Sequence, residues 1–245
     1  MDHDAETFYM YLGQENVKCK MVRSQRSRHV ALHITPEGFL EVKIPAQVIV
    51  PISDVWKFVK EKEGWILRSI NKMKKISEEA KAKEGYILFL GREVPLEIIE
   101  SKRKRAVARP HAGKLLVEIN KDSKESMREA IIKFYKKHAK EIIGKIVHRK
   151  ALEMGVSFQK ISLRSQKSRW GSCSSKRTLS FNFCLIGAPQ EVIEYVVVHE
   201  LAHLVHRNHS KAFWALVQKH CQNYNQHRKW LNKNGLLLKR RVIGA

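Results

Sequence analysis

The amino-acid sequence predicts an α+β fold in which a β-rich N-terminal part precedes a mainly helical part. Short segments rich in β-branched residues, separated by turn residues, dominate the first 121 residues. Apolar residues at helical spacing dominate the remainder of the 245-residue chain, which is long enough to bury a substantial core. We therefore predict two domains, a β-rich region with one helix over residues 1–121 and a second domain over residues 122–245.

The N-terminal region is predicted to begin with three strands and a helix. The strands are "VKCKMV" (17–22), "HVALHI" (29–34) and "FLEVKI" (39–44). Ser53 can cap a helix over residues 55–75, in which apolar residues recur at helical spacing and which Gly64 can interrupt.

Strand character returns at residues 86–99 and 114–120. Between them lies the basic segment "ESKRKRAVARPHAGK" (100–114), a run of like charges of the kind that most often forms a solvated connection. We expect this segment to be a loop.

The second domain is predicted to open with a long helix, capped by Asp122 or Ser123 and closed by Gly155. Residues 161–173 and 178–186 have strand character and flank the polar turn "SSKR". Two more helices are predicted, over residues 189–207 with Pro189 in the first turn, and over residues 210–224.

The chain is strongly basic, with 47 Lys and Arg against 24 Asp and Glu, a formal net charge of +23. Such a charge attracts polyanions, so an anionic substrate such as a nucleotide, a nucleic acid or an acidic partner is compatible with it. The four cysteines are too dispersed for a disulfide framework, and neither a secretory signal nor a membrane-spanning segment is visible. We expect a cytoplasmic protein with no membrane association.

Residues 196–210, "VVVHELAHLVHRNHS", crowd four histidines and a glutamate onto the end of an apolar helix. His199 and His203 are one helical turn apart, so both imidazoles can bind one metal ion. Glu200 follows the first histidine directly and can act on a water molecule without occupying the metal. Ionisable side chains on such an apolar helix need a partner, which favours a metal site over packed or solvated histidines.

A catalytic zinc ion normally has three protein ligands and a water molecule. After Glu200 the chain contains no Asp or Glu, so a downstream third ligand has to be a histidine or a cysteine. We favour His209, because Asn208 before it tolerates the left-handed conformation that ends helices and can reverse the chain. His206 is the alternative ligand, and otherwise a neighbour of the site or a solvated residue.

The motifs "RWGSC" (169–173), "HELAHL" (199–204) and "NHSKAFW" (208–214) together resemble the YgjP-like family of zinc metallopeptidase-type hydrolases. The upstream segments at residues 23–45, 63–67 and 90–98 are similar to the family as well. The resemblance implies a zincin-like metallohydrolase core with an active-site helix, preceded by the N-terminal β-rich part. It also implies that His199, His203 and His209 bind one Zn²⁺ per chain and that Glu200 is the catalytic base.

This machinery specifies a type of hydrolysis but not a substrate. The first hypothesis is cleavage of the phosphoanhydride of a nucleoside triphosphate, because nine Lys or Arg and no acid follow Glu200. The resemblance adds that family members are described as UTP pyrophosphohydrolases. The candidate substrate-binding residues are Arg164, Lys167, Arg169 and Trp170.

Two alternatives remain open. In a metallopeptidase, the strand over residues 178–186 could be an edge on which an extended peptide pairs, or else an ordinary internal strand. In a nucleic-acid-binding module with a structural zinc, the contacts would be "RSQRSRH" (23–29), "KRKRAVAR" (102–109) and "KRR" (239–241). Trp170 and Gly171 are typical of packing and a bend, and Phe213 and Trp214 are typical of a core.

Overall fold

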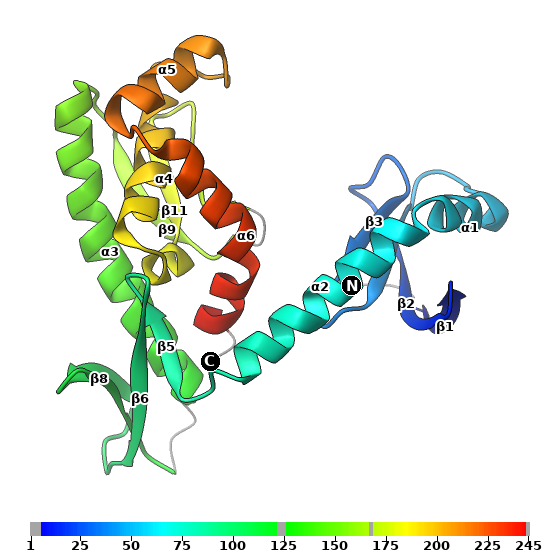
Figure 1. Cartoon of the computed structure of the whole chain (residues 1–245), viewed down its shortest axis with the longest axis horizontal. Coiled ribbons are helices and arrows are strands. Elements are labelled where there is room, and N and C mark those ends of the chain that lie inside the picture. Colours follow the sequence, from blue (N-terminus) through cyan, green and yellow to red (C-terminus); the bar gives the residue numbers. More distant parts are fainter. Residues whose placement is uncertain (1–5, 122–125, 167–168, 244–245) are drawn as a thin grey trace. The chain divides into compact units, whose positions relative to one another are not determined.

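The computed structural model describes residues 6–121, 126–166 and 169–243 (Figure 1). The chain forms two compact units, Met1–Lys81 and Ala82–Ala245. Mixed sheets and helices in both units confirm the predicted α+β class. This division lies N-terminal to the predicted domain boundary between residues 121 and 122. The predicted boundary is next to residues that the structure does not describe, and it stays a prediction.

The first unit is a four-stranded sheet covered on one face by two helices. The strands β1 (Glu6–Leu12), β2 (Glu15–Ser24), β3 (Ala31–Ile34) and β4 (Leu40–Pro45) follow the order β1-β2-β4-β3. Alternate residues of the strands form a core with α1 (Ile52–Glu61) and α2 (Glu63–Lys81). The three predicted strands are confirmed and β1 is additional. The predicted helix is broken at Lys62, whereas Gly64 lies inside α2.

The second unit begins with a sheet of the order β5-β6-β8-β7. Its strands are β5 (Tyr86–Phe89), β6 (Arg92–Glu100), β7 (Val107–His111) and β8 (Lys114–Ile119). The prediction that residues 100–114 form a loop is wrong for β7, which pairs with β8. The positive charge of the segment is partly neutralised there, because Arg103 and Arg109 form ion pairs of 2.8 and 2.9 Å with the buried carboxylate of Glu118. A segment with neutralised charges can pair with a neighbouring strand.

The long helix α3 (Met127–Met154) follows this sheet. Ser126 caps it through a capping box with Glu129, so the cap is not the predicted Asp122 or Ser123, which lie outside the described residues. Gly155 ends the helix as predicted, in the left-handed conformation with a φ of 64°.

A small three-stranded sheet lies next along the chain, with strands β9 (Lys160–Arg164), β10 (Gly171–Cys173) and β11 (Thr178–Asn182) in the order β10-β11-β9. The segment predicted as one strand over residues 161–173 is therefore divided between β9 and β10. The segment 178–186 is not an edge strand, because β11 pairs on both sides and passes into the 3₁₀ helix η1 (Phe183–Gly187).

Three helices complete the second unit: α4 (Gln190–Ala202), α5 (Lys211–His220) and α6 (Tyr224–Ile243). The helix α4 packs against both α3 and α6 (Figure 1). The helix α6 was not predicted from the sequence, because its buried apolar residues are few, Leu231, Leu238 and Val242, among many charged ones. None of the described helices is long and apolar enough to span a membrane.

Candidate metal centre

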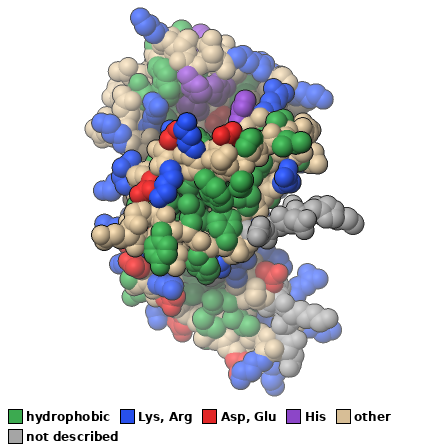
Figure 2. Space-filling view, turned by 90° about the vertical axis from the view of Figure 1, so that its right-hand side faces the viewer, with side chains coloured by type: hydrophobic (Ala, Val, Ile, Leu, Met, Phe, Trp, Pro, Cys, Tyr) green, Lys and Arg blue, Asp and Glu red, His purple; other side chains and the backbone are tan. Residues whose placement is uncertain are grey.

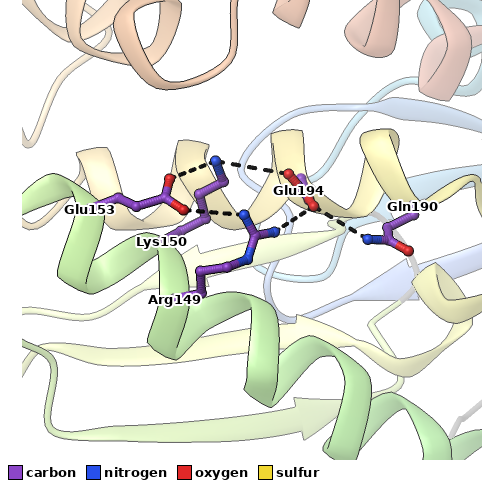
Figure 3. A network of polar contacts seen from close by, with 5 residues as sticks. All are labelled: Arg149, Lys150, Glu153, Gln190 and Glu194. Carbon is purple, nitrogen blue, oxygen red and sulfur yellow. Dashed lines mark hydrogen bonds and ion pairs between the residues drawn. The ribbon is translucent and has the colours of Figure 1, made fainter.

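The helix α4 is held in place by apolar burial and by ion pairs. Its residues Val192, Ile193, Val197, Val198 and Leu201 are buried in the main core. On its α3 side, Glu194 accepts a hydrogen bond of 2.5 Å from Arg149, which also contacts Glu153 on its own helix (Figure 3). Because Lys150 and Gln190 join the same network, α4 is fixed against α3 at its polar margin as well as in the core (Figure 3).

His199, His203 and His209 come together at the C-terminal end of α4. One side-chain nitrogen from each lies within 4.8 Å of the others. The Nε2 atoms of His199 and His209 are 3.1 Å apart. Three convergent imidazole nitrogens form the donor set that zinc prefers, and two of these histidines are only half-buried, so the cluster is open to solvent.

The chain reversal that returns His209 to the cluster begins at His203. The helix ends at Ala202, and Leu204 and Val205 donate backbone hydrogen bonds to the carbonyls of Leu201 and Ala202 in a tight turn. The predicted helix to residue 207 is therefore too long. The expected left-handed Asn208 is also wrong, because the non-glycine residues with a positive φ in the described chain are Leu90, Ala112 and Arg177.

His206 contributes its backbone rather than its ring. Its carbonyl oxygen lies 3.1 Å from Nδ1 of His203 and accepts a hydrogen bond from that nitrogen in the matching tautomer. The lone pair of His203 then lies on Nε2. A hydrogen bond from the second ring nitrogen to a carbonyl is the usual way in which a metal-ligating histidine is oriented.

The surroundings keep the histidines neutral and therefore able to bind a metal. Burial, together with the neighbouring His203 and His209, lowers the pKa of His199 to about 3. Burial also lowers the pKa of His203. Among the residues that the structure describes, Nδ1 of His199, the nitrogen on the other side of the ring from His209, is buried without a hydrogen-bond partner. A cluster of neutral imidazoles with convergent nitrogens fits a bound cation better than it fits a packed core.

Glu200 is buried beside this cluster, with 5% of its surface exposed, and its Oε2 has no hydrogen-bond partner in the part of the chain that the structure describes. Burial outweighs the opposing charge of Arg169 and raises the pKa of this carboxyl group to about 8. A buried carboxyl group with a pKa close to neutral pH is suited to general acid–base catalysis.

Gly171 of β10 forms one wall of the Glu200 site. A Cβ atom at this glycine would stand 2.5 Å from Oε1 of Glu200. Cys173, on the same side of β10, is half-buried, and its pKa is raised by burial and by the charge of Glu200. The sequence suggested only a bend at the Trp-Gly pair, and the role of the glycine could not be recognised without its distant contact.

Two aromatic residues of α5 support the histidines. The buried ring of Phe213 lies 4.6 to 5.0 Å from the three imidazole rings, between centroids. Trp214 stacks on the exposed His209 at 5.6 Å and on Tyr224 at 5.2 Å. Phe213 is a core residue as predicted, whereas Trp214 is only half-buried and lies beside the site.

Three of the four candidate substrate-binding residues, Arg164, Arg169 and Trp170, lie within the described residues. Arg169 is exposed and is the one whose charge acts on Glu200. Arg164 is exposed at the end of β9, and Lys167 lies outside the described residues. Trp170 packs against Gly235 of α6, and Nζ of Lys239 lies 4.5 Å from the centre of its ring. Their role in substrate binding stays a prediction.

Asn182 is a further residue that the sequence did not reveal. It is completely buried, and its amide donates hydrogen bonds to the carbonyls of Gln166 and Arg169 at 2.7 and 3.4 Å. Its backbone N–H donates to the carbonyl of Trp170 at 2.8 Å. Asn182 thereby anchors the segment that leads into Gly171.

Comparison with known families gives one match. The model of the YgjP-like family, metallopeptidase domain, matches residues 28–234, a range that includes the three histidines and Glu200. No curated protein matches the chain.

Solved structures with some similarity include two metallopeptidase zymogens. The zymogen of jannalysin from Methanocaldococcus jannaschii is 23% identical, with a TM-score of 0.32, over 37% of this chain and 95% of the other. The zymogen of abylysin from Pyrococcus abyssi is 22% identical, with a TM-score of 0.29, over 42% of this chain and 93% of the other.

Proposed function

This chain belongs to the YgjP-like family and is a metal-dependent hydrolase, and we propose that it is a zinc peptidase whose metal is bound by His199, His203 and His209. The observation that carries the proposal is the convergence of three imidazole nitrogens next to a buried glutamate. A structural zinc site has no need of that glutamate, whereas hydrolysis requires a base.

Zinc bound by the three histidines would lower the pKa of a water molecule and polarise the carbonyl of the substrate. Glu200 takes the proton from the attacking water and passes it to the leaving amine. The missing side chain of Gly171 leaves the room that the Glu200 carboxylate occupies next to β10. The contact between His203 and the His206 carbonyl holds the second imidazole in one orientation.

A peptide substrate is supported by the position of β10. This strand is the terminal strand of its sheet and lies against α4 at Glu200. An extended peptide that pairs with its free edge would run next to the carboxylate. The sequence suggested residues 178–186 as a possible edge, but β11 is internal, so we propose the neighbouring strand β10 for this role.

Peptide hydrolysis replaces the cleavage of a nucleoside triphosphate as the first hypothesis. The family is one of metallopeptidase domains, and the comparisons lend no support to a nucleotide pyrophosphatase. The nucleic-acid-binding module with a structural zinc leaves the buried Glu200 without a role.

The test compares the zinc-loaded protein with its Glu200→Gln variant. A mixture of quenched fluorescent peptides reports peptide cleavage, and pyrophosphate release from a panel of nucleoside triphosphates is measured in parallel. We expect about one zinc per chain in both proteins and peptide cleavage only in the first. Glu191→Gln, an exposed glutamate on the same helix, is the matched control and should retain activity.

Two outcomes would contradict the proposal. Glu200-dependent pyrophosphate release without peptide cleavage would make the protein a nucleotide hydrolase. Equal cleavage by the Glu200→Gln variant would assign the activity to a contaminant and leave the metal a structural role.

A further inference from the structure

The small sheet beside the metal centre is built from a stretch without acidic residues. Between Glu153 and Glu191 the sequence contains six Lys or Arg and no Asp or Glu. All three strands of the sheet, β9, β10 and β11, lie in this stretch. The solvated face of a sheet ordinarily mixes both signs of charge, so an acid-free face points to an anionic ligand.

The alternation of the strands separates an apolar face from a polar one. Ile161 and Leu163 of β9 and Leu179 and Phe181 of β11 pack against the main core. The residues between them therefore point to the opposite face of the sheet. On β10, Gly171 faces Glu200, so Ser172 also belongs to this opposite face, which is turned away from Glu200.

A row of three serines crosses the polar face. Ser172 of β10 is paired with Ser180 of β11, and Ser180 with Ser162 of β9. Lys160 and Arg164 stand on the same face, two residues to either side of Ser162. Serine side chains are short and the flanking cations are long, so Ser172 and Ser180 of this row form the floor of a hollow beside the cations.

This hollow is a shallow pocket with a volume of about 370 Å³, in the range of small-molecule sites. Its lining is polar and includes three cations, Lys160, Arg164 and Lys176. The hydroxyl groups in the lining come from Ser172, Ser174, Ser175, Thr178 and Ser180. No carboxylate lines the pocket among the residues that the structure describes.

The structure shows no acidic partner for the cations of the pocket among the residues that it describes. Within the described ranges, Lys160, Arg164 and Lys176 form no ion pair with a carboxylate. The unit that contains them, Ala82–Ala245, has 33 Lys and Arg against 13 Asp and Glu. Lys and Arg also outnumber acids over the face drawn in Figure 2, where they are scattered. The pocket differs from that scattered charge because it adds a floor of hydroxyl donors.

We propose that this pocket binds a phosphate group. A phosphate presents several oxygen acceptors at once, which suits a floor of hydroxyl groups with an arginine fork and ammonium groups around it. The site is distinct from the metal centre, because it lies on the face of the sheet opposite to Gly171 and Glu200. The proposal does not depend on the peptidase function.

The experiment uses the full zinc-loaded chain and calorimetric titration with inorganic phosphate, pyrophosphate and ATP in separate arms, at low and at physiological salt. We expect one saturable site per chain that is independent of Glu200. ATP binding tighter than phosphate would identify a nucleotide as the source of the group, and equal affinities would identify the free ion. Either result supports the proposal.

Two pairs of substitutions distinguish binding at a specific site from a general attraction by positive surface charge. Lys160→Gln with Lys176→Gln should weaken binding at least about tenfold, because charged hydrogen bonds are lost. Lys229→Gln with Lys233→Gln, exposed on α6, has the same net charge and should change it less than about twofold. Ser172→Ala leaves the charge unchanged and should weaken binding several-fold.

Equal weakening by the two pairs, or titrations that never saturate, would overturn the proposal. Zinc content is measured for every variant and should stay at one per chain. If no phosphate binding is measured while zinc binding persists, only the proposed phosphate site is rejected. If the variants also lose zinc, the claim that the two sites are separate is rejected.

Discussion

Gly171 and Glu200 lie so close together that no other residue fits the position of the glycine without a shift. The nearest approach of a built Cβ atom would be 2.5 Å to Oε1, and the Cγ and Cδ atoms of Glu200 would stand 2.6 and 2.8 Å away. The strand β10 and the helix α4 are thus in contact through two residues that are 29 positions apart in the sequence. The contact couples the "RWGSC" motif to the base of the proposed reaction.

The first prediction concerns this contact. Gly171→Ala should displace the Glu200 carboxylate and lower kcat at least about tenfold, because a misplaced base transfers protons poorly. The zinc content should stay unchanged, since the three atoms nearest to the new methyl group belong to Glu200 and not to a histidine. Measurements of kcat, KM and zinc content by mass spectrometry test this.

Gly144→Ala is the matched control. This glycine lies inside α3 with nothing within 4 Å of its Cβ direction. The substitution should leave kcat unchanged and stabilise the protein by about 0.5–1 kcal/mol, as expected for alanine in a helix interior. Equal activity of both alanine variants would show that Gly171 does not position Glu200.

The second prediction concerns the stacking of Trp214 on His209. His209 is the exposed member of the cluster, and the indole covers one face of its ring. Trp214→Leu should weaken zinc binding by about tenfold, in the range seen when groups that orient a ligand are removed. Trp214→Phe keeps an aromatic face and should lose less. Competition with a fluorescent zinc chelator gives the affinities, and identical values for all three proteins would contradict the role of the stack.

The third prediction gives a pH dependence of stability. Hydrogen bonds from Lys83 and from the buried Arg241 lower the pKa of Glu93 below its ordinary 4.5. A lowered pKa in the folded state stabilises the protein above the unfolded pKa, and this stability is lost as the pH falls through the folded value. Glu93→Gln should therefore cost at most about 1 kcal/mol at pH 7, and this cost should decrease as the pH falls below 4.5.

Urea unfolding of both proteins across that pH range tests the sign. Glu97→Gln is the control and should cost less at pH 7, because this half-buried glutamate of β6 forms its ion pair among the described residues with Lys114. A cost of Glu93→Gln that grows toward pH 3 would contradict the assigned direction.

The fourth prediction ranks the cysteines by reactivity. Burial raises the pKa of Cys184 to about 12 and that of Cys19 to about 11, so both are almost entirely thiols near neutral pH. Cys173 and Cys221 are half-buried, and their pKa values are also raised by burial. Iodoacetamide at pH 8 should alkylate Cys173 and Cys221 before the other two, as peptide mapping by mass spectrometry can show. Labelling of Cys184 as fast as of Cys221 would contradict its burial.

The sequence by itself determined the local parts of this protein. Helical periodicity places His199 and His203 on one face, and the family motifs around them identify the class of hydrolase. Most predicted strands and the Gly155 helix end are also present, because they depend on neighbours within a few residues. The absence of acids after Glu200 narrowed the third ligand to histidine or cysteine.

The tertiary structure decided what depends on distant contacts. The turn at His203 returns His209 to the cluster, β10 rather than residues 178–186 is the sheet edge, and Gly171 becomes the wall of the Glu200 site. Arg109 in the basic segment forms an ion pair with the buried Glu118, and this segment forms β7 instead of a loop. The register of β9 and β11 places Lys160 and Arg164 on the same face as a row of serines. Pairing and packing between segments far apart in the chain leave no local pattern, so periodicity could not reveal them.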